Sequence, residues 1–300
     1  MIHYLSTRHH DYTIRRFMEE AGAPLAGRVE PVAYDDVLEL DPRSLPGGVW
    51  IFTDYDRISG DQAARAARLW RHLADRGCRL LNHPTRSSRR FSLLRRLRAA
   101  GINDFDAYHL TDLRPPARFP VFLRRADAHS GPGSNLLDDQ ARLDRTLLAF
   151  RERGSPVETT ILVEYQDTRG VDGLYRKYGV MKVAARIFPV QVLTAEAWIN
   201  KRGSAARWTP DVVAAELDYF ERNPHREMVE RAFSIAGMEY GRIDFGLTDG
   251  RMQVWEINGN PSFTGSTPRV PERAEATAIA NHHLVDALIA LDDAHGSDGR

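Results

Sequence analysis

Short apolar segments alternate with amphipathic helical segments in the first third of the chain, and each helical segment ends at or next to a glycine. The expected strands are 1–6, 49–54 and 78–84, and the expected helices are 11–22, 60–77 and 89–102. This order favours a parallel sheet covered by helices on both faces, because parallel strands need crossover connections. The loops at the strand carboxyl ends, 6–10, 53–57 and 82–86, are therefore expected to line a functional crevice.

The pattern changes after segment 114–120, which is rich in proline and arginine. Strands and strand hairpins are expected at 119–125, 159–166, 178–193 and 242–258, and helices at 136–154, 210–238 and 275–294. Hairpins imply antiparallel pairing, in contrast to the first third. The sequence therefore predicts an α/β protein whose C-terminal part is α+β.

The composition excludes several classes of protein. Hydrophobic residues make up 42% of the chain and charged residues 27%, which is typical of a globular protein. The 41 basic and 41 acidic residues balance, which argues against broad attraction to nucleic acid or to an anionic membrane. Cys78 is the single cysteine, so an internal disulfide and a cysteine-based zinc site are excluded. Because no apolar run reaches the roughly 18 residues of a membrane span, a cytoplasmic location is expected.

Each strand of the predicted hairpin 242–258 carries a carboxylate among apolar residues. Asp244 lies on the first strand, and Glu256 and Asn258 share one face of the second. Paired side chains of antiparallel strands lie within about 5 Å of each other, and two carboxylates that close repel unless a positive charge lies between them. An oxygen-only set of ligands suits Mg²⁺ bound together with substrate phosphates. The alternative is an edge hairpin with solvent-exposed acids.

Segment 241–261 resembles the metal-binding end of the ATP-grasp superfamily, the ligases of the D-alanine–D-alanine ligase and glutathione synthetase type. In that family an Asp on one strand and a Glu-x-Asn on the next bind two Mg²⁺ ions that bridge the ATP phosphates. The matching residues are Asp244, Glu256 and Asn258. Arg242 matches an arginine of the D-alanine ligase pattern, and the resemblance implies that it steadies the transferred phosphoryl group.

The resemblance extends to positions that would hold the nucleotide, in the order that the family has them. They are a basic residue before a helix (Arg90), a basic residue on a strand (Arg124), a phosphate loop of small residues at 128–134 (with His129, Ser130 and Gly131) and an adenine hinge (Glu164 and Tyr165). The family usually has lysine where this chain has Arg90 and Arg124. Either the arginines bind the phosphates, or Lys182 and Lys201 contribute, or ATP binding is weaker.

Segment 176–189 resembles the family's hairpin whose inner face lines the active site. Lys182 and Arg186 are an even number of residues apart, so both are expected to face the cleft, Lys182 toward ATP and Arg186 toward the reacting groups. A solvent-exposed basic face is the alternative for each.

Other catalytic motifs are missing from the sequence. It contains no Gly-x-Ser-x-Gly elbow, no Walker-type Gly-Lys-Ser/Thr loop and no Gly-x-Gly-x-x-Gly fingerprint. The adjacent histidine pairs, at 9–10 and 282–283, cannot each direct both rings at one metal ion.

The resemblance implies three units: an N-terminal α/β domain at 1–113, a small subdomain with phosphate loop and hinge at 114–194, and a C-terminal subdomain with the metal site at 195–300. It implies an ATP- and Mg²⁺-dependent ligase that activates a substrate carboxylate as an acyl phosphate and joins it to an amine. The expected partners are small-molecule carboxylate and amine substrates, without nucleic acid or membrane, and a homodimer is left open. An inactive ATP-binding regulator or scaffold, or a kinase on the same fold, is the alternative.

Overall fold

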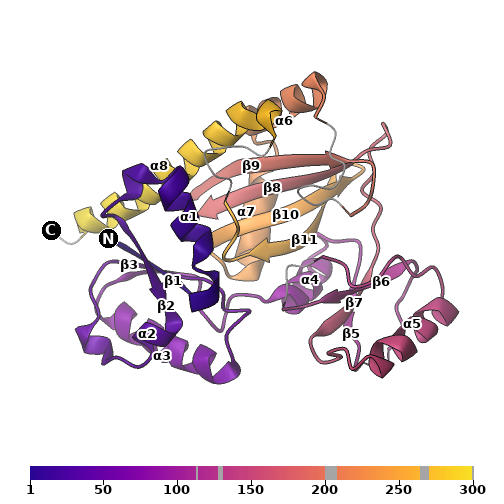
Figure 1. Ribbon diagram of the computed structural model, residues 1–300, viewed down its shortest axis with the longest axis horizontal. Helices are drawn as coiled ribbons and strands as arrows, with labels where there is room; N and C mark the ends of the chain where they lie inside the picture. The colour runs from indigo at the N-terminus through magenta and orange to yellow at the C-terminus, as the bar shows by residue number, and fades with distance from the viewer. Residues whose placement is uncertain (113, 128–130, 200–207, 264–269, 299–300) are drawn as a thin grey trace.

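A computed structural model describes residues 1–112, 114–127, 131–199, 208–263 and 270–298 of the chain. Three β-sheets and their covering helices build the described part of the molecule. Figure 1 shows the sheets side by side, and the sheet formed by residues 175–195 and 240–258 lies between the other two. Within these described ranges, four single-turn 3₁₀ helices connect the larger elements: η1 (Arg8–His10), η2 (Ala23–Leu25), η3 (Pro42–Ser44) and η4 (Pro271–Arg273).

The first sheet is parallel, with the strand order β2-β1-β3-β4. Its strands are β1 (Ile2–Ser6), β2 (Val29–Ala33), β3 (Val49–Phe52) and β4 (Arg79–Leu81), and its helices are α1 (Tyr12–Glu20), α2 (Tyr34–Val37) and α3 (Gly60–Asp75). Helix α4 (Arg90–Ala99) follows β4 in the chain but packs against β5, β11 and α7. The sequence did not predict β2, which contains Pro31 and lies at the sheet edge. Proline is tolerated there because an edge strand needs fewer backbone donors.

The second sheet is antiparallel, with the order β5-β7-β6. It consists of β5 (Ala107–His109), β6 (Val121–Arg125) and β7 (Thr160–Glu164). Helix α5 (Gln140–Glu152) begins where the Asp139 side chain accepts a hydrogen bond from the Arg142 backbone. Leu143 of α5 packs with Val121, Leu123 and Leu162, so the helix covers one face of this sheet.

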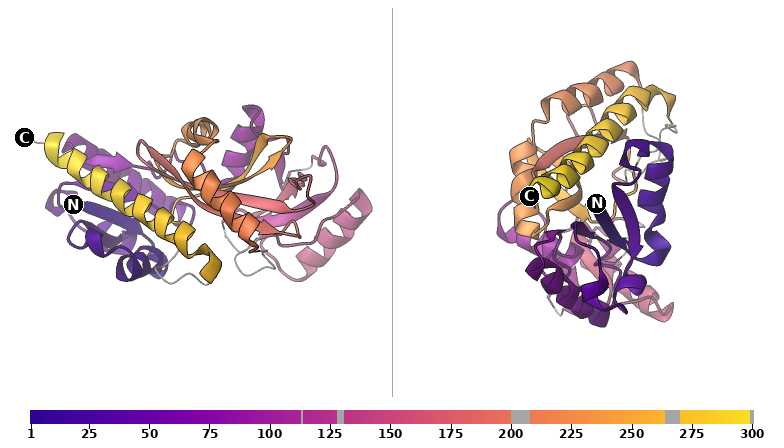
Figure 2. Two further views of the ribbon diagram at one scale, coloured as in Figure 1. Left: turned by 90° about the horizontal axis from the view of Figure 1, so that it is seen from above. Right: turned by 90° about the vertical axis from the view of Figure 1, so that its left-hand side faces the viewer.

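The third sheet is antiparallel, with the order β11-β10-β8-β9. Its strands are β8 (Tyr175–Val183), β9 (Arg186–Ala195), β10 (Tyr240–Thr248) and β11 (Arg251–Asn258), and its helices are α6 (Pro210–Arg222), α7 (Arg226–Ala236) and α8 (Ala274–Asp298). Helices α6 and α7 pack against one face, where their residues share a core with Ile243 and Phe245. Helix α8 packs between the other face and the first sheet (Figure 2).

The expected single helix at 210–238 is wrong, because the chain forms two helices there. Asn223 ends α6 in a left-handed conformation, with φ of 41°, and Pro224 follows. A left-handed residue closes a helix, and a proline after it prevents continuation.

The expected α/β architecture, with a parallel N-terminal sheet and antiparallel sheets later, is confirmed. Strand pairing crosses both expected unit boundaries: β5 joins the sheet of β6 and β7, and β8 and β9 join that of β10 and β11. The division at 113 and 194 therefore stays a prediction. In the part of the chain that the structure describes, no helix combines the length and the apolar character needed to cross a membrane.

Candidate active site

The hairpin of β10 and β11 pairs the acidic residues across two strands. Asp244 lies opposite Glu256, and Arg242 lies opposite Asn258. Opposed residues of antiparallel strands project to the same face, so the structure brings these four side chains together as the sequence predicted.

A β-bulge follows the Asp244–Glu256 pair, since Phe245 pairs with Val254 and Trp255 has no opposing residue. Trp255 and Glu256 consequently both line one cavity, although neighbouring strand residues normally alternate between faces. Bulges redirect side chains in this way near active sites. The sequence analysis expected regular alternation and did not predict this.

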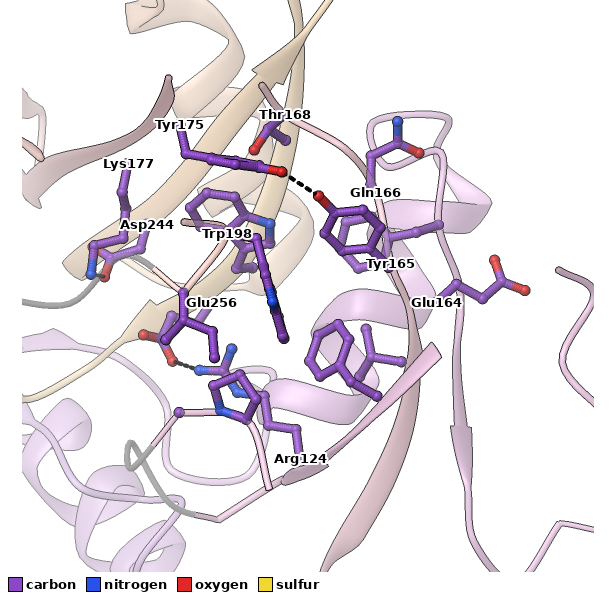
Figure 3. Close-up of a pocket in the computed structure, with 17 residues that line it drawn as sticks. Arg124, Glu164, Tyr165, Gln166, Thr168, Tyr175, Lys177, Trp198, Asp244 and Glu256 are labelled. Carbon is purple, nitrogen blue, oxygen red and sulfur yellow. Dashed lines mark hydrogen bonds and ion pairs between the residues drawn. The ribbon is translucent and has the colours of Figure 1, made fainter. Parts of the chain in front are cut away.

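The cavity lies between the second and third sheets and has a volume of about 190 Å³ (Figure 3). One part of its lining is aromatic, contributed by Phe105, Phe122, Tyr165, Tyr175, Trp198 and Trp255. Another part is charged, contributed by Arg124, Lys177, Asp244 and Glu256. An apolar pocket with a few convergent charged groups is the usual form of a small-molecule site.

Two cations hold the Asp244 carboxylate. Arg242 donates to both oxygens, Nε to Oδ1 at 2.7 Å and Nη2 to Oδ2 at 3.2 Å, and Lys177 Nζ lies 3.5 Å from Oδ2. Burial acts to lower the pKa of Arg242, but the charges of Asp244 and Glu256 and the hydrogen bond to Asp244 raise it overall. Arg242 therefore stays charged in its buried position.

Two further cations hold the Glu256 carboxylate. Arg124 Nη2 donates to Oε2 at 2.7 Å, and Arg90 Nη2 contacts the same oxygen. Burial lowers the pKa of Arg124 to about 10, an effect that Glu256 opposes and Arg90 reinforces. Among the described residues, these four cations exceed the two carboxylates by two positive charges, which suits a polyphosphate.

Comparison with known proteins places this geometry in a known architecture. No family model matches the chain. The chain is 30% identical over 188 residues to a D-alanine–D-alanine ligase of Nocardia farcinica, an alignment that covers 59% of this chain. The chain spans about half (49%) of the length of that curated relative.

Two solved structures superpose on almost the whole chain. One is a D-alanine–D-alanine ligase of Bacillus anthracis complexed with ATP, with a TM-score of 0.54, 14% identity and coverage of 99% of both chains. The other is a RimK domain ATP-grasp protein of Sphaerobacter thermophilus, with a TM-score of 0.51, 14% identity and coverage of 96% of this chain and 100% of the other. The chain has the ATP-grasp fold.

The donor set of the site fits the magnesium ions expected of an ATP-grasp protein only in part. Among the described residues, no three His, Cys, Asp or Glu side chains are grouped to hold a metal. The buried carboxylate of Asp244, the partly buried carboxylate of Glu256 and the amide of Asn258 are present, and Mg²⁺ commonly takes one or two carboxylates together with phosphate and water oxygens. The set is therefore adequate for a metal that arrives with a phosphate ligand. Asn258 Oδ1 also accepts a hydrogen bond from the Asn260 backbone at 3.0 Å, which fixes its side chain.

The two residues expected to form an adenine hinge differ in where their side chains lie. Tyr165 lines the cavity, where its hydroxyl lies 3.0 Å from that of Tyr175, and burial followed by this hydrogen bond raises its pKa. Glu164 also lines the cavity, but its carboxylate points away from the neighbouring side chains (Figure 3) and accepts hydrogen bonds from Tyr108 Oη at 2.7 Å and from the Asp106 backbone at 3.0 Å. Its side chain braces β5 instead of facing a ligand.

The expected ATP-grasp phosphate loop is described only in part. Gly131 lines the cavity, with a φ of 94° that favours glycine. His129 and Ser130 lie outside the described residues.

Lys182 and Arg186 do not share a face, so the expectation that both face the cleft is wrong. A turn at 184–185 reverses the chain between them, and Val183, not Lys182, pairs with Arg186. Lys182 Nζ pairs with Glu230 of α7 at 2.6 Å, on the face opposite to Asp244. Arg186 lines a separate surface hollow with Asn223, Arg226 and His283.

The sequence analysis did not assign Lys177 or Trp198 to the site. Lys177 shares its strand face with Gly179, which lies opposite Asp244. The one signal in the sequence that could have indicated a role for Lys177 is that lysine is rare, with only three in the chain. Trp198 lies in the cavity, packed against Phe122 and Tyr165 at ring-centroid distances of 5.1 and 5.7 Å, whereas its sequence left open whether it faces the cleft or solvent.

Proposed function

We propose that the chain is an ATP-dependent carboxylate–amine ligase whose cavity between the second and third sheets binds magnesium–ATP. The observation that carries the proposal is the arrangement at the charged part of the cavity. There, Arg90, Arg124, Lys177 and Arg242 surround Asp244 and Glu256. The ATP-grasp fold and the partial similarity to a D-alanine–D-alanine ligase support the same reading.

The base and the phosphates would occupy different parts of the cavity. The aromatic lining, with Phe122, Tyr165 and Trp198, offers flat apolar faces for an adenine ring. Arg124 and Lys177 would bind the phosphate oxygens, and Arg242 would steady the phosphoryl group during transfer.

Asp244, Glu256 and Asn258 would hold Mg²⁺, which neutralises the charge that develops on the phosphates. The residues of the chain then contribute position and charge, because phosphoryl transfer asks for little covalent chemistry from the protein.

The reaction that we propose follows from the relatives. The γ-phosphate of ATP passes to a substrate carboxylate to form an acyl phosphate and ADP. An amine then attacks the acyl carbon, an amide bond forms, and phosphate and the amine proton leave. An amino acid or a peptide-like molecule is the proposed substrate class. The cytoplasmic location and the homodimer stay predictions.

Acceptor-dependent ADP release tests the proposal. Purified protein is incubated with ATP, Mg²⁺ and mixed D- and L-amino acids, and ADP is measured with and without the amino acids. We expect sustained release that requires both the amino acids and Mg²⁺. Binding of ATP without turnover would favour the inactive regulator, and a stable phosphate ester would favour the kinase.

Glu256→Ala should abolish this ADP release while the far-ultraviolet circular dichroism stays unchanged. Its carboxylate belongs to the proposed metal site at the wall of the cavity. Its loss removes an ion-pair partner of Arg90 and Arg124 and should lower stability without changing the secondary structure. Arg125→Ala is the matched control, since Arg125 pairs with Asp127 and is not part of the cavity lining. Normal turnover by Glu256→Ala would refute the metal assignment.

A further inference from the structure

One carboxylate oxygen of Glu256 accepts hydrogen bonds from two guanidinium groups. Arg124 of β6 contacts Oε2 at 2.7 Å, and Arg90 at the start of α4 contacts the same atom. Figure 3 shows the Arg124 guanidinium directed at Glu256 at the wall of the cavity. Arg90 and Arg124 are called the arginine pair below.

The arginine pair is buried, so its charges interact strongly. The Arg90 side chain is 4% exposed, and the Arg124 and Glu256 side chains are each 14% exposed. Charges attract and repel more strongly away from water, and a buried charge without a partner is costly. Arg90 Nη1 also donates to the backbone oxygen of Arg125 at 2.8 Å, which fixes the guanidinium beside the carboxylate.

A divalent ion at Glu256 would compete with the arginine pair. A metal on Oε2 would lie within a few ångströms of two positive charges in a poorly solvated site, where like charges repel. A triphosphate changes this balance, because its oxygens accept the guanidinium hydrogen bonds and its charge offsets the cations. Glu256 would then be released for the metal.

We propose that the arginine pair keeps divalent metal off Glu256 until a polyphosphate binds both guanidiniums; the proposal rests on the nucleotide site proposed above. Metal and nucleotide then bind with positive coupling, and each raises the affinity of the other by the same factor. Arg90 and Arg124 thus have two roles, as phosphate ligands when nucleotide is bound and as competitors of the metal when it is not.

The proposal predicts that one substitution raises the affinity for metal and lowers the affinity for nucleotide. Arg124→Gln removes one cation from Oε2, so Mn²⁺ added without nucleotide should bind about tenfold more tightly. Metal-free ATP, measured in the presence of a chelator, should bind about tenfold more weakly, which is the usual cost of losing a charged hydrogen bond. Electron paramagnetic resonance reports free Mn²⁺, and the fluorescence of Trp198 and Trp255 in the cavity reports ATP.

Three further variants make the experiment specific. Arg125→Gln removes an exposed arginine of the same strand that pairs with Asp127, and should change neither affinity. The double variant Arg124→Gln/Glu256→Gln should lose the gain in Mn²⁺ affinity, which assigns that gain to Glu256. Arg124→Lys keeps a positive charge and should give a smaller gain; it carries the test if Arg124→Gln unfolds in a thermal melt.

A purely structural role of the arginine pair predicts that Arg124→Gln leaves Mn²⁺ affinity unchanged or lowers it, and either result would overturn the proposal. The Mn²⁺ measurement needs no nucleotide. If wild-type protein fails to bind ATP, the proposed function fails, whereas a gain of Mn²⁺ affinity in Arg124→Gln would still show the competition at Glu256.

Discussion

Four cationic side chains of the described residues surround the carboxylates at the charged part of the cavity, and they come from four different elements. Arg90 lies on α4, Arg124 on β6, Lys177 on β8 and Arg242 on β10. Each pairs with Asp244 or Glu256. Because buried ion pairs gain little net stability once desolvation is counted, their concentration at one cavity is better explained by ligand binding than by folding.

Lys177→Met should raise the dissociation constant for magnesium–ATP about tenfold, since it removes the cation 3.5 Å from Asp244 while keeping an unbranched side chain only one atom shorter. Arg186→Ala should leave that constant unchanged, because Arg186 lines a separate surface hollow. Calorimetric titration of both variants measures the difference. Equal weakening in the two would contradict the placement of the site.

Only some residues of the candidate site can be predicted from the sequence alone. The sequence placed Asp244, Glu256 and Asn258 on the two strands of one hairpin, but the register set by its turn alone would put Asp244 opposite Trp255. The bulge at Trp255 shifts the register so that Asp244 lies opposite Glu256. Lys177 joins Asp244 through pairing between β8 and β10, whose sequence positions are far apart. Lys182 and Arg186 were expected to share a face because an even number of residues separates them. This rule holds only within one strand, and a turn lies between these two residues.

At the scale of elements, two side-chain networks hold the hairpin β10–β11 against the first sheet. Asn82, at the end of β4, bonds to the backbone of Glu239 and Tyr240 before Gly241. Asn260, just after β11, bonds to residues near the ends of β1 and β3; its partners are Tyr4, Thr13, the His10 backbone and Asp54. The hairpin that carries Asp244 and Glu256 is therefore positioned at its open end, where β10 begins and β11 ends, by residues that follow the strands of the first sheet.

Asn260→Ala should lower the free energy of unfolding by about 2–4 kcal/mol, because it leaves buried donors and acceptors without partners. Urea denaturation measures the change. Asn135→Ala, at an exposed position, serves as control and should stay within about 0.5 kcal/mol of wild type. A loss below about 1 kcal/mol for Asn260→Ala would show that the network contributes little.

At the scale of the whole molecule, the local sequence pattern was sufficient to predict the order of most elements. The features that the sequence did not predict depend on tertiary contacts. The alternation of strands and helices in the first third was sufficient to predict a parallel sheet. The three-residue strand β5 was not predictable, since it is defined only by pairing with β7. The cavity itself depends on how the second and third sheets meet, which no segment specifies alone.

Global stability should depend on pH through His225, which packs among the rings of Tyr178, Tyr219 and Phe245. Burial lowers its pKa below 6.5, so the unfolded chain takes up the proton first as the pH falls. The contribution of neutral His225 is therefore present above pH 6.5 and is lost as the pH falls through the lowered folded value.

His225→Gln should lose less stability than wild type between pH 8 and pH 5, as measured by urea denaturation at each pH. The remaining decline belongs to other histidines with lowered pKa values, such as His3 and His283. An identical decline in the variant and in wild type would show that His225 is not responsible.

A crystal structure with Mn²⁺ and a non-hydrolysable ATP analogue tests the central claim most directly. The account predicts anomalous scattering peaks between the paired Asp244 and Glu256 carboxylates, with the triphosphate on Arg124 and Lys177 and the base among Tyr165 and Trp198. A nucleotide bound elsewhere, or manganese peaks away from both carboxylates while the analogue is ordered, would contradict it.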